Sequence, residues 1–275
     1  MPTLDSAAGS PEHGLAGQII NTQDEAVRPM LEASLLTVSF PGPRRETVTP
    51  LKDFSISIKS GQITCLLGAS GSGKTTLLRA LGGFIIGAPT GGVLFDGRYL
   101  AAPTSEIVMI FQEHNLFPWL NVKDNVGFGL RYSRWSNQEK AHRLQAIIET
   151  VGLTDAVSRY PHQLSGGMRQ RVAIARSLVT EPRVLLLDEP FSALDVTLRR
   201  RMSEMTNRIW RELGTTMVLV THNIEEAITM GHRVVILGRQ PAQILLDSDT
   251  SDPQFKDRYG KRFLELQRHI EELIE

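Results

Sequence analysis

Residues 63–81 read ITCLLGASGSGKTTLLRAL, and this stretch decides the fold. Residues 63–67 form a short apolar run of the kind found in strands buried on both faces, and residues 75–81 have helical spacing. The glycine-rich loop between them, from Gly68 to Thr75, matches the phosphate-binding pattern G-x-x-x-x-G-K-[ST] in full. Strand, loop and helix in this order predict an α/β protein with a phosphate-binding loop.

Each residue type in this loop has a physical reason. Glycines allow backbone N–H groups to surround phosphates at a helix N-terminus, where the helix dipole favours anions. Lys74 is expected to reach the β and γ phosphates, and Thr75 to place its hydroxyl on Mg²⁺. The loop residues predicted to bind ATP are Gly68, Ser70, Gly71, Ser72, Gly73, Lys74, Thr75 and Thr76.

A second element that carries chemistry is VLLLDEP, residues 184–190. It predicts a buried strand that delivers two carboxylates at its carboxyl end, where ligands bind in open α/β sheets. Asp188 is placed to hold Mg²⁺, and Glu189 to orient or deprotonate the attacking water. Alone, the pattern would also suit a strand followed by an acidic helix start, but the complete phosphate loop favours a nucleotide triphosphatase.

The remaining patterns outline one nucleotide-binding domain at residues 31–246 with a helical insertion at about 113–182. Apolar runs that alternate with helical patterns argue for a mostly parallel sheet covered on both faces. Residues 1–30 are predicted to be a disordered tail, and residues 247–275 a C-terminal helical extension. The expected strands are residues 35–40, 54–58, 63–67, 107–111, 184–187, 217–220 and 234–237, and the clearest helices are 137–151, 166–179 and 261–275.

Composition excludes several classes of protein. Apolar residues make up 41% and charged residues 22% of the 275 residues, which excludes a wholly disordered, collagenous or disulfide-framework chain. Thirty basic and thirty acidic side chains leave no net charge, so we predict no nucleic-acid partner and interpret Arg199 to Arg201 as a solvated helix face. With one cysteine, Cys65, and no long apolar run or leader pattern, we expect no disulfide, membrane span or secretory signal.

Residues 164–171, LSGGMRQR, resemble the signature motif of the ATP-binding cassette (ABC) family. A serine and two glycines at a helix N-terminus form a second anion-binding surface, although a capped helix start would look the same in isolation. The resemblance implies a RecA-like P-loop NTPase fold with an antiparallel β subdomain and an inserted helical subdomain. It also implies that Ser165, Gly166 and Gly167 contact the ATP held by a second, head-to-tail cassette, with a homodimer expected.

Further residues match the pattern of that family. Gln112 resembles the Q-loop glutamine that contacts Mg²⁺ and water, and His222 resembles the switch histidine that contacts the γ-phosphate. Asp195 closes SALD, residues 192–195, which resembles the D-loop. Phe40 stands where the family stacks an aromatic ring on adenine, but a phenylalanine in a strand is as often a core residue. The resemblance thus implies Glu189, His222 and Gln112 as catalytic residues, and Thr75, Gln112 and Asp188 as Mg²⁺ ligands.

The stretches 111–120 and 189–195 look like the nitrate, sulfonate and taurine importer branch of the family. Residues 239–243, RQPAQ, depart from the Arg-Pro-Gly turn usual in that branch. This similarity implies an ATPase at the cytoplasmic face of the inner membrane, with separate integral permease subunits and, indirectly, an extracytoplasmic substrate-binding protein. Residues 117–120 are candidates for the permease groove or, equally, for core. A soluble ATPase of iron–sulfur cluster assembly is the alternative.

Overall fold

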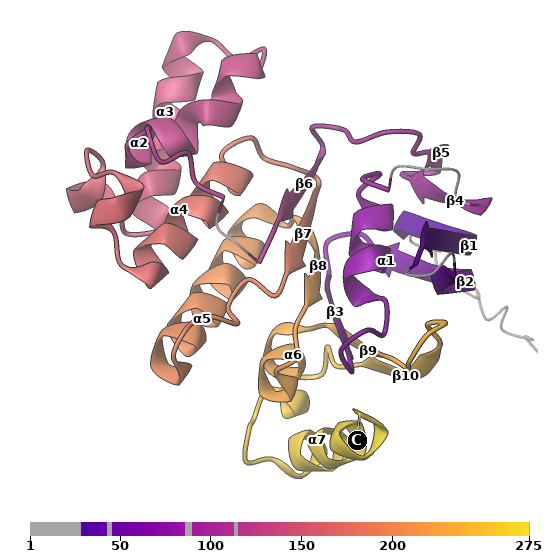
Figure 1. Ribbon diagram of the computed structural model, residues 1–275. Helices are drawn as coiled ribbons and strands as arrows, with labels where there is room; N and C mark the ends of the chain where they lie inside the picture. The colour runs from indigo at the N-terminus through magenta and orange to yellow at the C-terminus, as the bar shows by residue number, and fades with distance from the viewer. Residues whose placement is uncertain (1–28, 43–45, 86–89, 113–114, 275) are drawn as a thin grey trace, which may run out of the picture.

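The computed structural model describes residues 29–42, 46–85, 90–112 and 115–274, which form two sheets and the helices that pack around them (Figure 1). The larger sheet has the strand order β10-β9-β3-β8-β7-β6. Strands β9, β3, β8, β7 and β6 pair in parallel, and β10 pairs with β9 in antiparallel fashion. These strands are β3 (Ile63–Gly68), β6 (Ile107–Ile110), β7 (Val184–Asp188), β8 (Thr216–Val220), β9 (Arg233–Leu237) and β10 (Ile244–Asp249).

The smaller sheet is antiparallel, with the order β2-β1-β4-β5. Its strands are β1 (Pro29–Pro41), β2 (Thr47–Lys59), β4 (Thr90–Phe95) and β5 (Arg98–Tyr99). Helix α1 (Lys74–Leu81) lies between the two sheets (Figure 1), and Leu77 and Leu81 share one buried cluster with Leu36 of β1 and Leu186 of β7. This cluster fixes the helix that follows the phosphate loop.

Between β6 and β7 the described residues form only helices and loops, which project from one side of the large sheet (Figure 1). Ser136 begins α3 with a capping box, because its side chain accepts from the Glu139 N–H and the Glu139 carboxylate accepts from the Ser136 N–H. The α-helices of the chain after α1 are α2 (Val122–Val126), α3 (Asn137–Thr150), α4 (Gly166–Leu178), α5 (Val196–Leu213), α6 (Ile224–Met230) and α7 (Lys261–Ile274).

The structure differs from the sequence expectations at element boundaries and in the strands β4, β5 and β10, which were not among the expected strands. Strand β1 starts at Pro29, inside the expected tail, while residues 1–28 lie outside the described part of the chain. The first half of β1 was not predicted because the strand is irregular in its middle. Leu35 is 65% exposed with a φ of 48°, and the pairing of β1 with β2 shifts register between Ala33 and Leu36. Strand β10 crosses the boundary expected at residue 246. None of the described helices is both long and apolar enough to cross a membrane.

Helix α7 is attached to the domain by the two buried residues of its amphipathic face. Phe263 is 2% exposed and Ile270 is fully buried, and both belong to the cluster that also contains Ile228 of α6 and Val234 of β9. Lys256, just before this helix, donates to the Ile228 and Gly231 carbonyls at the end of α6. The extension therefore packs on α6 as part of the same core.

We expect Phe263→Ala to lower the free energy of unfolding by about 3–5 kcal/mol, because it leaves a cavity where a large ring is buried. Leu264→Ala, at a neighbouring side chain that is 47% exposed, is the matched control and should change it by less than about 1 kcal/mol. Urea denaturation of both variants measures the difference. Equal effects would show that α7 is not packed as described.

Candidate active site

The phosphate loop adopts a backbone that requires glycine at two positions. Gly68 ends β3 with a φ of 148°, and a Cβ there would lie 2.2 Å from the Leu237 carbonyl oxygen of β9. Gly73 precedes α1 with a φ of 92°, in the left-handed region that side chains rarely adopt. The loop can therefore close tightly over the end of β3 and lead directly into the first turn of α1, whose N–H groups have no partner within the helix.

Lys74 is drawn into the loop. Its Nζ donates to the carbonyl oxygens of Gly68 and Ala69, both at 2.9 Å, and to the Ser72 hydroxyl at 3.3 Å. Burial lowers the pKa of the Lys74 ammonium, and the nearby carboxylates of Glu189 and Asp188 oppose this shift. A buried cation beside exposed loop N–H groups is suited to binding phosphate oxygens.

Thr75 and Asp188 join the loop to the acidic strand. The Thr75 hydroxyl donates to Asp188 Oδ1 at 3.1 Å, so the first turn of α1 contacts the carboxyl end of β7. Burial raises the pKa of the Asp188 carboxyl above its ordinary value, while the hydrogen bond from Thr75 opposes the rise. A hydroxyl and a carboxylate side by side are hard oxygen donors, which fits Mg²⁺ held by few protein ligands and by phosphates.

Glu189 and His222 face each other at the ends of adjacent strands. His222 Nδ1 lies 3.4 Å from Glu189 Oε2, and the Glu189 N–H donates to the Val220 carbonyl at 3.0 Å. Glu189 has a φ of 45°, which is strained for a residue with a side chain and is typical of functional sites. This pair can orient or deprotonate a water molecule, because the carboxylate accepts a proton and the imidazole lies beside it.

Lys74, Thr75, Glu189 and His222 line one cavity of about 430 Å³ above the phosphate loop, whereas Asp188 contacts Thr75 without lining the cavity itself. It contains every loop residue predicted to bind ATP, together with Glu189 and His222. Gln240 also lines it, and sequence reasoning gave that residue no role, although the unusual turn at residues 239–243 was the available signal. The lining residues are Gly68, Ser70, Gly71, Ser72, Gly73, Lys74, Thr75, Thr76, Glu189, His222 and Gln240.

The other predicted site residues do not line this cavity. Gln112 is exposed just after β6, and Phe40 is 37% exposed near the end of β1, so it is not a core residue. Ser165 caps α4 by accepting from the Met168 N–H at 3.3 Å, and Asp195 caps α5 by accepting from the Leu198 N–H at 2.9 Å. Their roles toward ATP stay predictions.

The first turns of α4 and α5 lie against each other. A Cβ at Gly167 would approach the Leu198 side chain to 2.6 Å, so only glycine allows this contact without a shift of that side chain. Gly167 is buried, whereas Ser165 and Asp195 are exposed at the helix starts. The signature motif and Leu198, which follows the D-loop on α5, are therefore in contact, and neither Ser165 nor Asp195 lines the phosphate-loop cavity.

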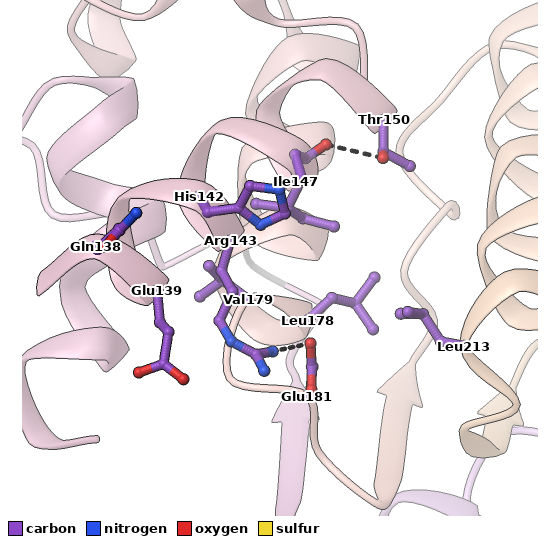
Figure 2. Close-up of a pocket in the computed structure, with 11 residues that line it drawn as sticks. Gln138, Glu139, His142, Arg143, Ile147, Thr150, Leu178, Val179, Glu181 and Leu213 are labelled. Carbon is purple, nitrogen blue, oxygen red and sulfur yellow. Dashed lines mark hydrogen bonds and ion pairs between the residues drawn. The ribbon is translucent and has the colours of Figure 1, made fainter. Parts of the chain in front are cut away.

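A larger cavity, of about 540 Å³, lies between one face of α3 and the ends of α4 and α5 (Figure 2). On its wall Arg143 pairs with Glu181 and stacks on the Trp135 ring at 3.8 Å, and His142 and Glu139 line it as well. Leu178, Val179 and Leu213 supply an apolar wall. None of its described lining residues belongs to the glycine-rich loop or the acidic strand, so we place the active site at the phosphate loop.

Comparison with known proteins agrees with this geometry. The sequence profile of the ABC transporter family matches residues 51–192, which include the phosphate loop, the signature motif and the acidic strand. The chain belongs to the ABC transporter family. It is thus an ATP-hydrolysing cassette, and the expected mainly parallel sheet with an antiparallel β subdomain is confirmed.

Two relatives and one solved structure represent the similarity. The nitrate import ATP-binding protein NrtD of Synechocystis sp. is 39% identical over 88% of this chain and 90% of its own length. The taurine import ATP-binding protein TauB of Roseobacter denitrificans is 35% identical over 89% of this chain and 95% of its own. A dimeric post-hydrolysis structure of the cassette MJ0796 with ADP and Pi has a TM-score of 0.69 at 29% identity, covering 80% of this chain and 99% of that one.

We expect Asp188→Asn to raise the free energy of unfolding of the nucleotide-free ABC cassette at pH 7. Burial raises the folded-state pKa of Asp188, so its ionisation costs folding free energy above the ordinary aspartate value of 3.8. Asparagine keeps an oxygen acceptor for Thr75 without the charge. The gain should shrink as the pH falls toward about 4, where the unfolded chain also holds the proton. Urea unfolding from pH 7 downward measures it, and a gain that grows on acidification would contradict the electrostatic cause.

Proposed function

We propose that this cassette is the ATPase subunit of a bacterial importer, pairing with a second cassette around two ATP molecules and driving a separate integral membrane permease. The single observation that carries the proposal is the convergence of Lys74, Glu189 and His222 on the phosphate-loop cavity. Together these residues provide a cation that can bind phosphate, a carboxylate that can hold the attacking water, and an imidazole that can orient the γ-phosphate. A protein that only binds nucleotide needs neither of the last two.

The position of each group supports a catalytic role for it in this proposal. Lys74 and the loop N–H groups hold the β and γ phosphates, and Glu189 holds the attacking water and takes up its proton. His222, beside Glu189, orients the γ-phosphate. Bound Mg²⁺ would neutralise phosphate charge, and Thr75, Asp188 and the predicted Gln112 would hold it.

A second cassette completes the site. Ser165, Gly166, Gly167 and Asp195 lie at the starts of α4 and α5 and do not line the phosphate-loop cavity of their own chain, which supports a role toward a nucleotide held by another cassette. The dimeric structure of the relative MJ0796 supports this arrangement. Each chain would then supply one half of two composite sites, and ATP would close the dimer until Glu189 acts.

An aromatic surface, composed of Phe117, Trp119, Phe128 and Tyr132, is suited to receive the permease. The Phe117 ring lies 5.7 Å from Trp119 and 4.5 Å from Phe128, while Phe128 lies 6.2 Å from Tyr132. Trp119 is 70% and Tyr132 80% exposed, which is unusual for such large rings. Interfaces are enriched in exposed aromatic residues, so this surface favours a protein partner over core packing.

The cargo is proposed to be a small anion such as nitrate, a sulfonate or taurine, because nitrate and taurine import proteins are similar over most of this chain. In that arrangement the permease and an extracytoplasmic binding protein select the cargo. The cassette itself would work at the cytoplasmic face of the inner membrane. A soluble iron–sulfur assembly ATPase is the alternative to be tested.

We expect Glu189→Gln to reduce ATP turnover by about 100-fold or more while the variant accumulates as an ATP-bound dimer, because the amide cannot take a proton from water. Steady-state hydrolysis and size-exclusion chromatography with ATP measure the two effects. Glu204→Gln, at an exposed residue of α5, is the matched control and should behave as wild type.

Adding Ser165→Arg to the Glu189→Gln chain should abolish the trapped dimer while leaving ATP affinity of the monomer within about threefold, since the serine acts across the dimer. Full turnover in Glu189→Gln would remove Glu189 from its catalytic role. Loss of ATP binding by the monomeric double variant would contradict the composite site.

Trp119→Ala is expected to reduce, by about tenfold, recovery of an integral membrane permease with this chain from detergent-solubilised membranes. Tyr259→Ala, at a ring that is 92% exposed away from the aromatic surface, should leave recovery unchanged. Mass spectrometry identifies the proteins recovered, and a linked binding protein would report the cargo through its ligand. Recovery of soluble scaffold proteins alone, with ATPase activity intact, would favour the assembly ATPase.

A further inference from the structure

Glu226 on α6 is a buried carboxylate that none of the catalytic steps uses. It is 7% exposed, and both of its oxygens are occupied. The Ser203 hydroxyl of α5 donates to Oε1 at 3.0 Å, and the Thr221 hydroxyl donates to Oε2 in a short hydrogen bond. Glu226 therefore links α5 to the residue that immediately precedes His222.

The carboxylate reaches the turn that carries His222 through Thr221, and the backbone N–H of Glu226 holds the same turn through Asn223. The Asn223 N–H donates to the Thr221 hydroxyl oxygen at 3.1 Å, and the Asn223 side chain accepts from the Glu226 N–H at 2.9 Å. His222 thus lies between two residues whose polar groups are both tied to Glu226. The His222 ring makes no hydrogen bond with Thr221, Asn223 or Glu226, and its side chain is 55% exposed, so the backbone of the turn determines where the imidazole lies.

Helix α5 extends this connection to the D-loop. One turn before Ser203, the Arg199 guanidinium donates to the carbonyls of Phe191, Ser192 and Leu194, at 3.3, 3.4 and 3.0 Å. These residues lie two to five positions after Glu189, and Asp195 caps the same helix. Helices α5 and α6 contact each other in the fold (Figure 1), so the two loops flanking the catalytic pair share one support.

Burying a carboxylate among hydroxyl groups is costly, because an apolar side chain of similar size would avoid desolvation. Burial raises the pKa of Glu226, and the hydrogen bonds from Thr221 and Ser203 oppose that rise. The bonds made by Glu226 are directed at one turn and one helix, both next to the catalytic pair. A specific geometric role accounts for this cost better than packing alone.

We propose that Glu226 is a positioning residue for hydrolysis: through Thr221 its carboxylate holds the turn that carries His222 beside Glu189, and through Ser203 it ties that turn to α5, the helix that follows the D-loop. The inference rests on the proposed role of His222 in catalysis. It requires no contact between Glu226 and nucleotide. Loss of Glu226 should therefore lower kcat and leave ATP binding nearly unchanged.

The test is steady-state ATP hydrolysis by the full chain. Glu226→Leu keeps the volume and removes both acceptors, and we expect kcat to fall about tenfold or more with KM within about twofold. Glu226→Gln can still bond both hydroxyls, because each hydroxyl can donate or accept, and should restore kcat to within about threefold of wild type. Glu225→Gln is the matched control on the same helix, since Glu225 pairs with Arg258 and Arg200 rather than with the turn.

A double-mutant cycle with His222→Ala, read by a radiolabelled single-turnover assay, separates positioning from general destabilisation. If Glu226 acts through His222, Glu226→Leu should cost little further activity once His222 is absent. An equal loss of rate in both backgrounds would overturn the proposal. Full activity of His222→Ala together with a low rate of Glu226→Leu would also overturn it, and that pattern would separately remove His222 from the proposed function.

Where Glu226→Leu fails to fold, Thr221→Val replaces it, because this isosteric change removes the bond next to His222 and leaves Ser203 in place. Thermal unfolding identifies that case. The expected result is again a reduced kcat with KM nearly unchanged. Wild-type kcat in a folded Thr221→Val chain would contradict the proposed path to His222.

Discussion

The active site depends on the parallel pairing of β3, β8 and β7. Leu66 is aligned with Val220, and Val220 with Asp188, so the carboxyl ends of the three strands meet at one edge of the sheet. Each strand continues into a segment with different chemistry, namely the phosphate loop, the turn with His222 and the acidic pair. Because backbone hydrogen bonds fix this register, a slip of one residue would separate groups that must act together.

The same edge concentrates strain and buried charge. Gly68 closes against the Leu237 carbonyl, Glu189 has a positive φ, and Lys74 and Asp188 are both buried. The opposite charges of Lys74 and Asp188 limit each other's desolvation cost, and the apolar cluster around α1 holds the helix that carries Lys74. The backbone strain and the buried charges of this site lower the stability of the fold, and the packing of the apolar core offsets that cost.

Much of the site could be predicted because its chemistry is local in sequence. Eight loop residues and the acidic pair lie in two short segments, so their spacing alone indicated their use. Gln240 was not predicted, since it reaches the cavity only because β9 and β10 form a hairpin beside the loop. Strand β1 was predicted too short because its bulge at Leu35 breaks the alternation on which strand prediction depends.

The sequence by itself determined that the chain binds and hydrolyses ATP, since a phosphate loop, a signature motif and an acidic strand are each continuous runs of residues whose types the chemistry requires. Only the tertiary structure decided which groups meet. It brought His222 to Glu189, joined Thr75 to Asp188, left Phe40 exposed, and connected Glu226 to residues of two other segments. Such contacts depend on strand register and helix packing between segments far apart in the chain, and no local pattern encodes them.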